Sequence, residues 1–380
     1  MDICCCCCLG GYTASFNTAK FMYLGLFVVS AIVSWVFRDY GNEFVHQLPE
    51  MEACRPNDDE GLNSDCVGKG AVLRISFATF TFHLAHMIAL FGCKSEADPR
   101  TAVHTSCFGL KFSAWMLLVF VSFFIPNEFF GVYGEVARVF SGVFLIFQAI
   151  VLIDIVYRIN EALLSKEGCM AGLIAISTSL YILSLIIIAL SYHFYAPRGT
   201  CSTNVGWITW TLIMAIAYTA LSISPWRIEN AGLLTSGAVF IYTSYLLINA
   251  LASEPTDDSN PCVTEGGMDG EWIQATGFVI ALAAVVVSTV STGTGDLSID
   301  SGDGLPYRPD FFHVTFSLAA MYLAMLFTNW SLEETPEEWE LGKGWQSAWV
   351  KIASQWLVVL LYIWTMIAPV LLPDREFSWA

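Results

Sequence analysis

The sequence predicts an all-α membrane protein that crosses the bilayer about ten times. Hydrophobic residues make up 56% of the 380 residues, and charged residues only 13%, whereas soluble domains carry about 25% charged residues. Long apolar runs recur along the whole chain, without the alternation of apolar and polar residues that a membrane β-barrel requires. The formal net charge of −17 argues against nucleic acid as a partner.

The positions of the spans follow from the apolar runs. A helix needs about 20 apolar residues to cross a hydrocarbon core about 30 Å thick, and in lipid each segment must satisfy its own backbone polar groups. The expected spans are 19–37, 71–91, 107–125, 132–164, 170–192, 205–223, 231–252, 272–291, 311–330 and 347–372. We also expect a polar outer loop over 38–70 and a flexible inner loop over 292–309, which is rich in Gly, Asp and Ser.

The run 132–164 predicts the central helix of the protein. It contains no proline and predicts one helix about 50 Å long, which must tilt or project beyond the bilayer. Asp154 and Arg158 are one helical turn apart, the spacing of an intrahelical ion pair. Two interpretations stay open, a polar path for a substrate and a structural ion pair that locks the helix to its neighbours. The residues proposed for the path are Asp154, Arg158, Asn160, Glu161 and, on the ninth span, His313.

The remaining polar residues of the spans give weaker indications. Arg74 and Lys351 lie at the starts of spans, where a long cationic side chain usually extends to the membrane edge. His83 and His86 have a spacing that could bind a metal from one helix face, but no cysteine or aspartate in a span supplies the further ligands. We therefore expect no metal site and no cofactor. No nucleophile–base motif is present, so we do not expect an enzyme.

The cysteines indicate compartments. Cys4, Cys5, Cys6, Cys7 and Cys8 precede the first span within residues 1–18, and this run predicts S-palmitoylation at the cytosolic membrane face. With a cytosolic N-terminus and ten spans, both termini are cytosolic. Four other cysteines then face the oxidising side, which fits two disulfides. We favour Cys54–Cys66 and Cys201–Cys262, although three connectivities are open.

Several short motifs occur in a familiar order along nearly the whole chain. They include Cys4–Cys8, Asp98-Pro99-Arg100, His104, Lys111, Leu152-Ile153-Asp154, Asn160-Glu161, Ser253-Glu254-Pro255, Tyr307, Phe311-Phe312-His313, Trp349-Val350-Lys351-Ile352 and Arg375-Glu376-Phe377. In these motifs the chain resembles the serine incorporator family, with the closest likeness to plant, algal or protist members. It departs from the family where Cys262 follows Asn260-Pro261 instead of preceding it, and where Tyr157, Arg158 and Ile159 replace the family's frequent His, Ser and Trp.

The resemblance implies ten transmembrane helices in two bundles, bridged by a long tilted fourth helix. It implies a lipid-handling protein, with scramblase-like movement of phospholipids along a groove beside that helix. One alternative is a serine carrier or scaffold that supports phosphatidylserine and sphingolipid biosynthesis. A second is an ion-coupled transporter, which would predict paired interrupted spans that we do not see.

The same resemblance sets expectations for partners and location. We expect membrane phospholipids, with sphingolipids or sterol, as ligands, lipid-biosynthesis enzymes as protein partners, and a homo-oligomer. The expected location is an endomembrane of the endoplasmic reticulum or Golgi, or the plasma membrane. The chain would be a multi-pass protein with both termini cytosolic.

Overall fold

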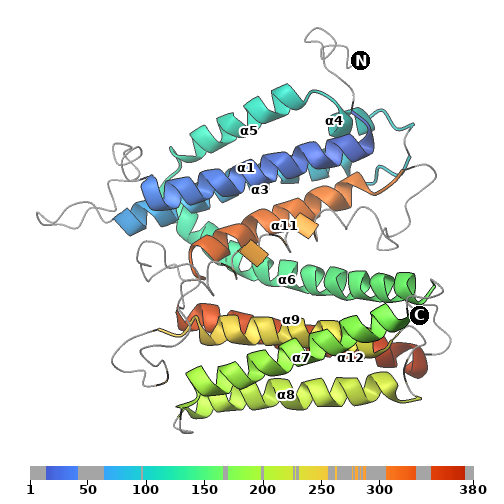
Figure 1. The fold of residues 1–380 in the computed structure, drawn as a ribbon. Coiled ribbons are helices and arrows are strands. Elements are labelled where there is room, and N and C mark those ends of the chain that lie inside the picture. Colours follow the sequence, from blue (N-terminus) through green and yellow to red (C-terminus); the bar gives the residue numbers. More distant parts are fainter. Residues whose placement is uncertain are drawn as a thin grey trace, which may run out of the picture. The chain divides into compact units, whose positions relative to one another are not determined.

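A computed structural model describes residues 14–41, 64–95, 97–165, 170–197, 201–225, 227, 231–255, 262, 276, 279–280, 283, 286–287, 305–330 and 344–372. Within these residues the chain is helical, and no strand is present. The helices, shown in Figure 1, are α1 (Phe16–Tyr40), α3 (Ser64–Leu90), α4 (Thr101–Thr105), α5 (Phe108–Ser122), α6 (Asn127–Leu164), α7 (Met170–Tyr195), α8 (Ser202–Ile223), α9 (Leu233–Leu251), α11 (Pro309–Phe327) and α12 (Trp345–Leu371).

The prediction of an all-α, multi-pass membrane protein is confirmed. Among the described residues, 8 helices are long and apolar enough to cross a membrane. The expected span 107–125 is helical over only 15 residues, Phe108–Ser122, about 22 Å at 1.5 Å per residue and hence short of a bilayer core. Most of the expected span 272–291 lies outside the described residues, as do residues 1–13 and most of the inner loop 292–309.

The long helix α6 is longer than predicted. It has 38 residues, about 57 Å at 1.5 Å per residue, and begins at Asn127 instead of residue 132. Pro126 explains this start, because proline lacks a backbone donor and restricts the residue before it, whereas no proline follows within the helix. The outer loop 38–70 is correspondingly shorter than expected, since α1 continues to Tyr40 and α3 begins at Ser64.

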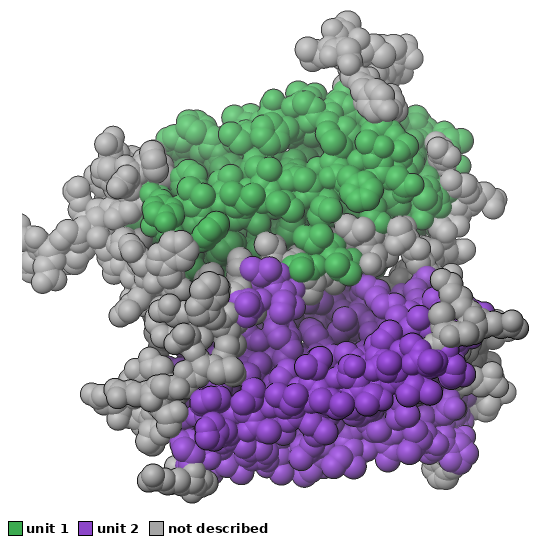
Figure 2. Space-filling model, viewed as in Figure 1, with its two compact units in different colours: residues 1–144, 281–341 green, residues 145–280, 342–380 purple. Residues whose placement is uncertain are grey.

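The chain divides into two compact units (Figure 2). Unit 1 comprises Met1–Phe144 and Ala281–Leu341, and unit 2 comprises Leu145–Ile280 and Gly342–Ala380. The division falls inside α6, so one continuous helix contributes its first half to unit 1 and its second half to unit 2. Each unit is described separately below.

Each unit is built around one central helix. In unit 1, α11 packs against α3 and α1, and 83% of an apolar 18-residue stretch of this helix is buried within the protein. In unit 2, α9 packs against α7, α8 and α12, and 72% of its corresponding apolar stretch is buried. By contrast, only 17% of the corresponding apolar stretch of α7 is buried. Because α7 exposes an apolar surface along its length, it has the character of a lipid-facing helix.

Candidate functional site

The polar segment of α6 lies in unit 2. The Nε of Arg158 donates to Oδ2 of Asp154 at 2.8 Å, in the i,i+4 arrangement expected from the sequence. The Asp154 side chain is 25% exposed and that of Arg158 41% exposed. Asn160 is buried, and Glu161 is exposed. A partly exposed ion pair therefore occurs within a helix that is long and apolar enough to cross a membrane.

A hydrogen bond from Tyr157 helps to anchor this segment to its unit. The hydroxyl of Tyr157 lies 3.1 Å from Oγ1 of Thr365 on α12, and the Tyr157 ring is buried. Tyr157 precedes Arg158 directly, so its packing fixes the rotation of α6 about its axis here. The Asp154–Arg158 pair consequently lies on a flank of α6 that unit 2 covers only in part.

His313, the other residue proposed for the path, belongs to unit 1 and is part of a buried histidine cluster. Its Nδ1 lies 3.0 Å from Nδ1 of His83 on α3, and its Nε2 lies 3.1 Å from Nδ1 of His104 on α4. All three side chains are fully buried. His86, one turn beyond His83, packs its ring against His313 with centroids 4.9 Å apart. The cluster thus contains four of the chain's 6 histidines.

Two tyrosines and a lysine complete the cluster. Nε2 of His104 lies 2.8 Å from the hydroxyl of Tyr307, which donates to the carbonyl oxygen of Phe16 at 2.8 Å. Tyr23 donates from its hydroxyl to the carbonyl oxygen of His104 at 3.1 Å and stacks on the His104 ring. Lys111 Nζ donates to the same carbonyl at 2.9 Å. Burial, together with the Lys111 charge, lowers the pKa of His104 to about 3, so this ring is neutral at ordinary pH.

Local sequence fixes the ends of the helices that carry these groups. Ser15 accepts a hydrogen bond from the backbone nitrogen of Thr18 at 3.2 Å and starts α1 at Phe16. Pro309 stands in the first turn of α11, where its missing donor costs nothing. Asp310 in the same turn accepts a hydrogen bond from the Gly92 nitrogen at 3.2 Å. Its negative charge also interacts favourably with the positive end of the helix dipole. Both α1 and α11 therefore begin at residues suited to a helix amino terminus.

The spacing of His83 and His86 does not make a metal site in the part of the chain that the structure describes. His83 Nδ1 faces His313, and His86 Nδ1 lies 2.8 Å from the carbonyl oxygen of Phe82. Among the described residues no group of three or more His, Cys, Asp or Glu side chains could hold a metal ion. The histidines contact one another instead.

The expectation that Arg74 extends to the membrane edge is wrong. Its side chain is fully buried and donates to the carbonyl oxygen of Ile125 at 3.1 Å and to Oδ1 of Asn127 at 2.8 Å. The guanidinium also lies over the Phe130 ring, 4.3 Å from its centroid. Arg74 thereby satisfies the end of the α5–α6 connection, where a proline leaves backbone carbonyls without helical partners.

Lys351 is likewise engaged within the protein. Its Nζ donates to Oγ of Ser253 at 2.6 Å and to the carbonyl oxygen of Asn249 at 3.3 Å. These acceptors lie at the carboxyl end of α9, whose last carbonyls lack helical donors. Lys351 therefore caps α9 from α12.

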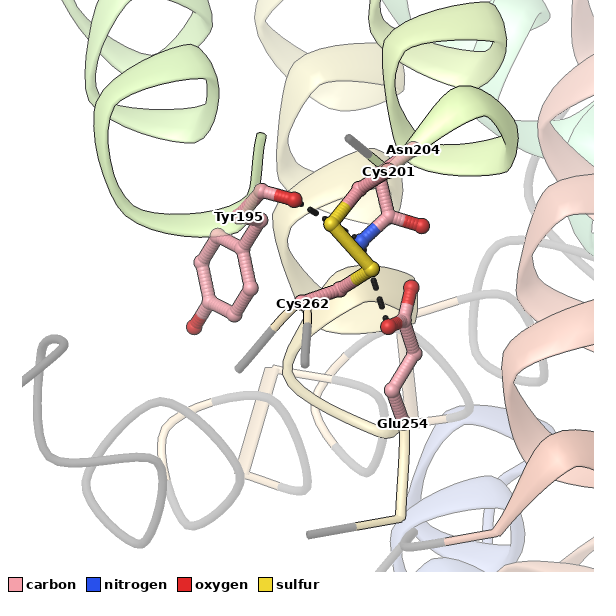
Figure 3. The surroundings of a disulfide bond; sticks show 5 residues. All are labelled: Tyr195, Cys201, Asn204, Glu254 and Cys262. Carbon is pink, nitrogen blue, oxygen red and sulfur yellow. Dashed lines mark hydrogen bonds between the residues drawn. A yellow bond between two sulfur atoms is a disulfide. The ribbon is translucent and has the colours of Figure 1, made fainter. Parts of the chain in front are cut away.

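Unit 2 contains the Cys201–Cys262 disulfide that the sequence analysis favoured, with a Cα–Cα distance of 5.6 Å. Figure 3 shows its surroundings. Asn204 donates from Nδ2 to the carbonyl oxygen of Tyr195 at 2.9 Å and to Oε2 of Glu254 at 3.1 Å. Asn204 and Glu254 are both buried. The disulfide and Asn204 together connect the ends of α7 and α9 to the start of α8. The proposed Cys54–Cys66 pair and the acylation candidates Cys4–Cys8 lie outside the described residues and side chains.

Sequence reasoning found part of this arrangement. It selected His313 and noted the spacing of His83 and His86, but it did not assign a site to His104, Tyr307 or Tyr23. His104 and Tyr307 are 203 residues apart, and no local pattern links them. Their presence among the motifs of the family resemblance was the available signal.

The helices and the buried polar groups define a multi-pass, all-α integral membrane protein. The family model described as "Serine incorporator (Serinc)" matches residues 1–302 and 293–375. The chain therefore belongs to the serine incorporator family.

Named relatives agree with this assignment. Serine incorporator 3 of Mus musculus is 28% identical, and the match covers 84% of this chain and 83% of the mouse protein. A protein of Monosiga brevicollis named "Probable serine incorporator" is 27% identical over 95% of this chain and 92% of its own length. One from Dictyostelium discoideum with the same name is 29% identical, with 95% of both chains covered. The likeness extends over at least 83% of the length of each of these proteins.

Proposed function

We propose that this protein moves phospholipids between the two leaflets of its membrane, and that their headgroups pass along the polar flank of α6 in unit 2. The observation that carries the proposal is the Asp154–Arg158 ion pair, which joins Oδ2 and Nε at 2.8 Å and leaves both side chains partly exposed. The proposal deepens the family assignment, which by itself gives no activity.

Charge inside a membrane helix is costly. A charged side chain at the centre of a spanning helix costs about 2.5–3.5 kcal/mol even on the milder insertion scale, and such residues usually face a wet cavity or a partner. Asp154 is 10 residues from the end of α6 at Leu164, about 15 Å along the helix axis. We place the pair within the hydrocarbon core of the membrane, where an exposed charge needs a polar surrounding.

A phospholipid headgroup can supply that surrounding. Common headgroups carry a phosphate anion and an amine cation a few ångströms apart, which is the complement of a carboxylate and a guanidinium one helical turn apart. Arg158 can bind the phosphate through its planar donors, while Asp154 accepts from the amine. Exchange of the internal bond for two bonds to a headgroup keeps both charges paired, so neither is left uncompensated in the membrane.

The experiment is a lipid-scrambling assay in reconstituted liposomes. Labelled phospholipids with several headgroups report, through quenching by dithionite, how much label reaches the outer leaflet. We expect the wild-type protein to expose label from the inner leaflet without added nucleotide or ions. Well-folded, inserted protein that exposes no more label than empty liposomes would overturn the proposal and leave the serine carrier or scaffold as the better hypothesis.

A further inference from the structure

The histidine cluster of unit 1 has a direction that its hydrogen bonds fix. The Tyr307 hydroxyl has one proton, and it donates this proton to the carbonyl oxygen of Phe16 at 2.8 Å, because a carbonyl oxygen can only accept. At 2.8 Å from the Tyr307 oxygen, Nε2 of His104 must therefore be the donor. A neutral imidazole carries one proton, so Nδ1 of His104 is an acceptor.

The same reasoning assigns the next two rings. Nε2 of His313, at 3.1 Å from Nδ1 of His104, must carry the proton of that contact. Nδ1 of His313 is then an acceptor, so Nδ1 of His83, 3.0 Å away, carries a proton. The tautomer of each ring therefore follows from the hydrogen-bond network. A single row of donors thus runs from His83 through His313 and His104 to Tyr307.

The row leaves one acceptor over. With its proton on Nδ1, His83 presents a lone pair on Nε2, and this atom is buried without a hydrogen-bond partner among the residues that the structure describes. A buried acceptor without a donor is unfavourable, because it has lost the hydrogen bonds that it makes in water. The rest of the row is satisfied, so this cost falls at one atom of one side chain.

We propose that Nε2 of His83 is a proton-binding site, and that the added proton's charge is shared by His83, His313 and His104. An aqueous proton bonds to Nε2 of His83 and makes this ring an imidazolium. When the N–H bond at Nδ1 of His83 breaks, its proton bonds to Nδ1 of His313. The Nε2 proton of His313 can then move to Nδ1 of His104. The cluster gains one positive charge at every stage, and no other reactant is needed.

The groups around the row limit where the charge rests. Among the described residues, the titratable side chains in contact with the row are Tyr23 on α1, His86 on α3 and Tyr307. Charged side chains lie one contact further out: Lys20 over the Tyr307 ring, Lys111 over the Tyr23 ring, and Asp310, which accepts from the Gly92 nitrogen. Lys111 donates to the His104 carbonyl and so opposes a second cation on that ring. The Asp310 carboxylate is engaged by Arg308 at 2.6 Å. The charge therefore favours the His83–His313 end, and the row ends at Phe16 without an outlet.

Proton uptake would act on packing. His83, His104 and His313 lie on α3, α4 and α11, and the Phe16 carbonyl lies at the start of α1. A proton on the row reorders bonds that join these four helices, so occupancy couples acid pH to the arrangement of unit 1. This site is independent of the proposed lipid path, which involves only unit 2.

The test is solid-state NMR of the full-length protein in lipid bilayers with nitrogen-15 in its histidine rings. At neutral pH we expect a proton on Nδ1 of His83 and on Nε2 of both His104 and His313. On acidification we expect these three rings to titrate together, with one proton taken up. Protons on Nδ1 of His104 or His313 at neutral pH, or three independent titrations, would overturn the proposal.

A variant isolates the binding atom. In His83→Asn, the amide nitrogen lies near the place of Nδ1 and can still donate to His313, but nothing corresponds to Nε2. We expect the tautomers of His313 and His104 to remain and the shared titration to be lost. His193→Asn, which removes an exposed histidine of unit 2, should leave it unchanged. A shared titration that survives His83→Asn, or that disappears in His193→Asn, contradicts the assignment. The tautomers of the unaltered chain test the proposal even if His83→Asn folds poorly.

Discussion

Nε2 of His104 and the hydroxyl of Tyr307 lie 2.8 Å apart, although 203 residues separate them in the chain. Through this contact α4 is connected to the segment that precedes α11, and Tyr307 continues the connection to the carbonyl oxygen of Phe16 at the start of α1. One hydroxyl therefore satisfies polar groups from two other parts of unit 1.

Tyr307→Phe removes that hydroxyl and little else. It leaves the buried His104 donor and the Phe16 carbonyl oxygen without their present partner, and each unsatisfied group costs about 1–3 kcal/mol. We expect a clear decrease in Tm. The fluorescence of the chain's 13 tryptophans can be used to measure it. Tyr40→Phe, at a side chain that is 54% exposed, is the matched control. Equal Tm values for the two variants would show that the Tyr307 bonds contribute no stability.

Acid should destabilise the fold through His104. In the unfolded chain a histidine takes up a proton near pH 6.5, whereas burial lowers the pKa of folded His104 to about 3. Between these values the unfolded state binds more protons, so stability is complete above about pH 6.5 and falls as the pH decreases, by up to about 1.4 kcal/mol per pH unit.

The check is a series of Tm measurements from neutral pH to about pH 5. His104→Gln retains a donor toward Tyr307 but cannot take up a proton. We expect a lower Tm at neutral pH and a shallower decrease with acid than in the wild type. His193→Gln, in unit 2, is the control for the loss of any histidine. A wild-type slope in His104→Gln would count against a neutral, buried His104.

Arg74 and Arg138 should respond very differently to substitution. Arg74→Met leaves the partly buried Ile125 carbonyl and Asn127 amide oxygen without their present donor and removes a fully buried guanidinium, which should cost more than the ~1 kcal/mol of a surface pair. Arg138 pairs with Glu135 at 3.0 Å, and these side chains are 38% and 61% exposed. We expect a large Tm decrease for Arg74→Met and almost none for Arg138→Met. Similar Tm values would mean that Arg74 is not buried as described.

The Cys201–Cys262 disulfide tests both stability and topology. It closes a separation of 61 residues, for which chain entropy gives about 4 kcal/mol. The double variant Cys201→Ser, Cys262→Ser should have a lower Tm, whereas Cys93→Ser, at a cysteine without a disulfide, should change it less.

If both termini are cytosolic, a membrane-impermeable maleimide should label Cys201 and Cys262, after reduction, from the exterior or lumen only. Labelling from the cytosolic side would contradict the predicted orientation.

Local pattern was sufficient for much of the fold and for one part of the candidate site. The absence of proline after Pro126 predicted α6, and its start was missed by 5 residues because five further helix-compatible residues precede the predicted start. The Asp154–Arg158 pair follows from helical spacing alone and is present at 2.8 Å. Length, composition and period are properties of single segments, so they can be read from the sequence.

Tertiary contacts could not be predicted in this way. Arg74 was expected at the membrane edge, because the sequence gives no indication that the carbonyl of Ile125 and the amide of Asn127, more than 50 residues away, would receive its donors. His83 and His313 face each other across 230 residues. A histidine's partner depends on how helices pack, and a single sequence does not contain that information in any local period.

The most direct test compares two ion pairs on the same helix in the scrambling assay. Asp154→Ala removes the carboxylate of the partly exposed pair in unit 2, and Glu135→Ala removes that of the more exposed pair in unit 1. With equal insertion and folding, headgroup passage along α6 predicts scrambling that is markedly slower in Asp154→Ala and unchanged in Glu135→Ala. Wild-type rates in Asp154→Ala, for every headgroup examined, would contradict the account and leave the Asp154–Arg158 pair a structural one.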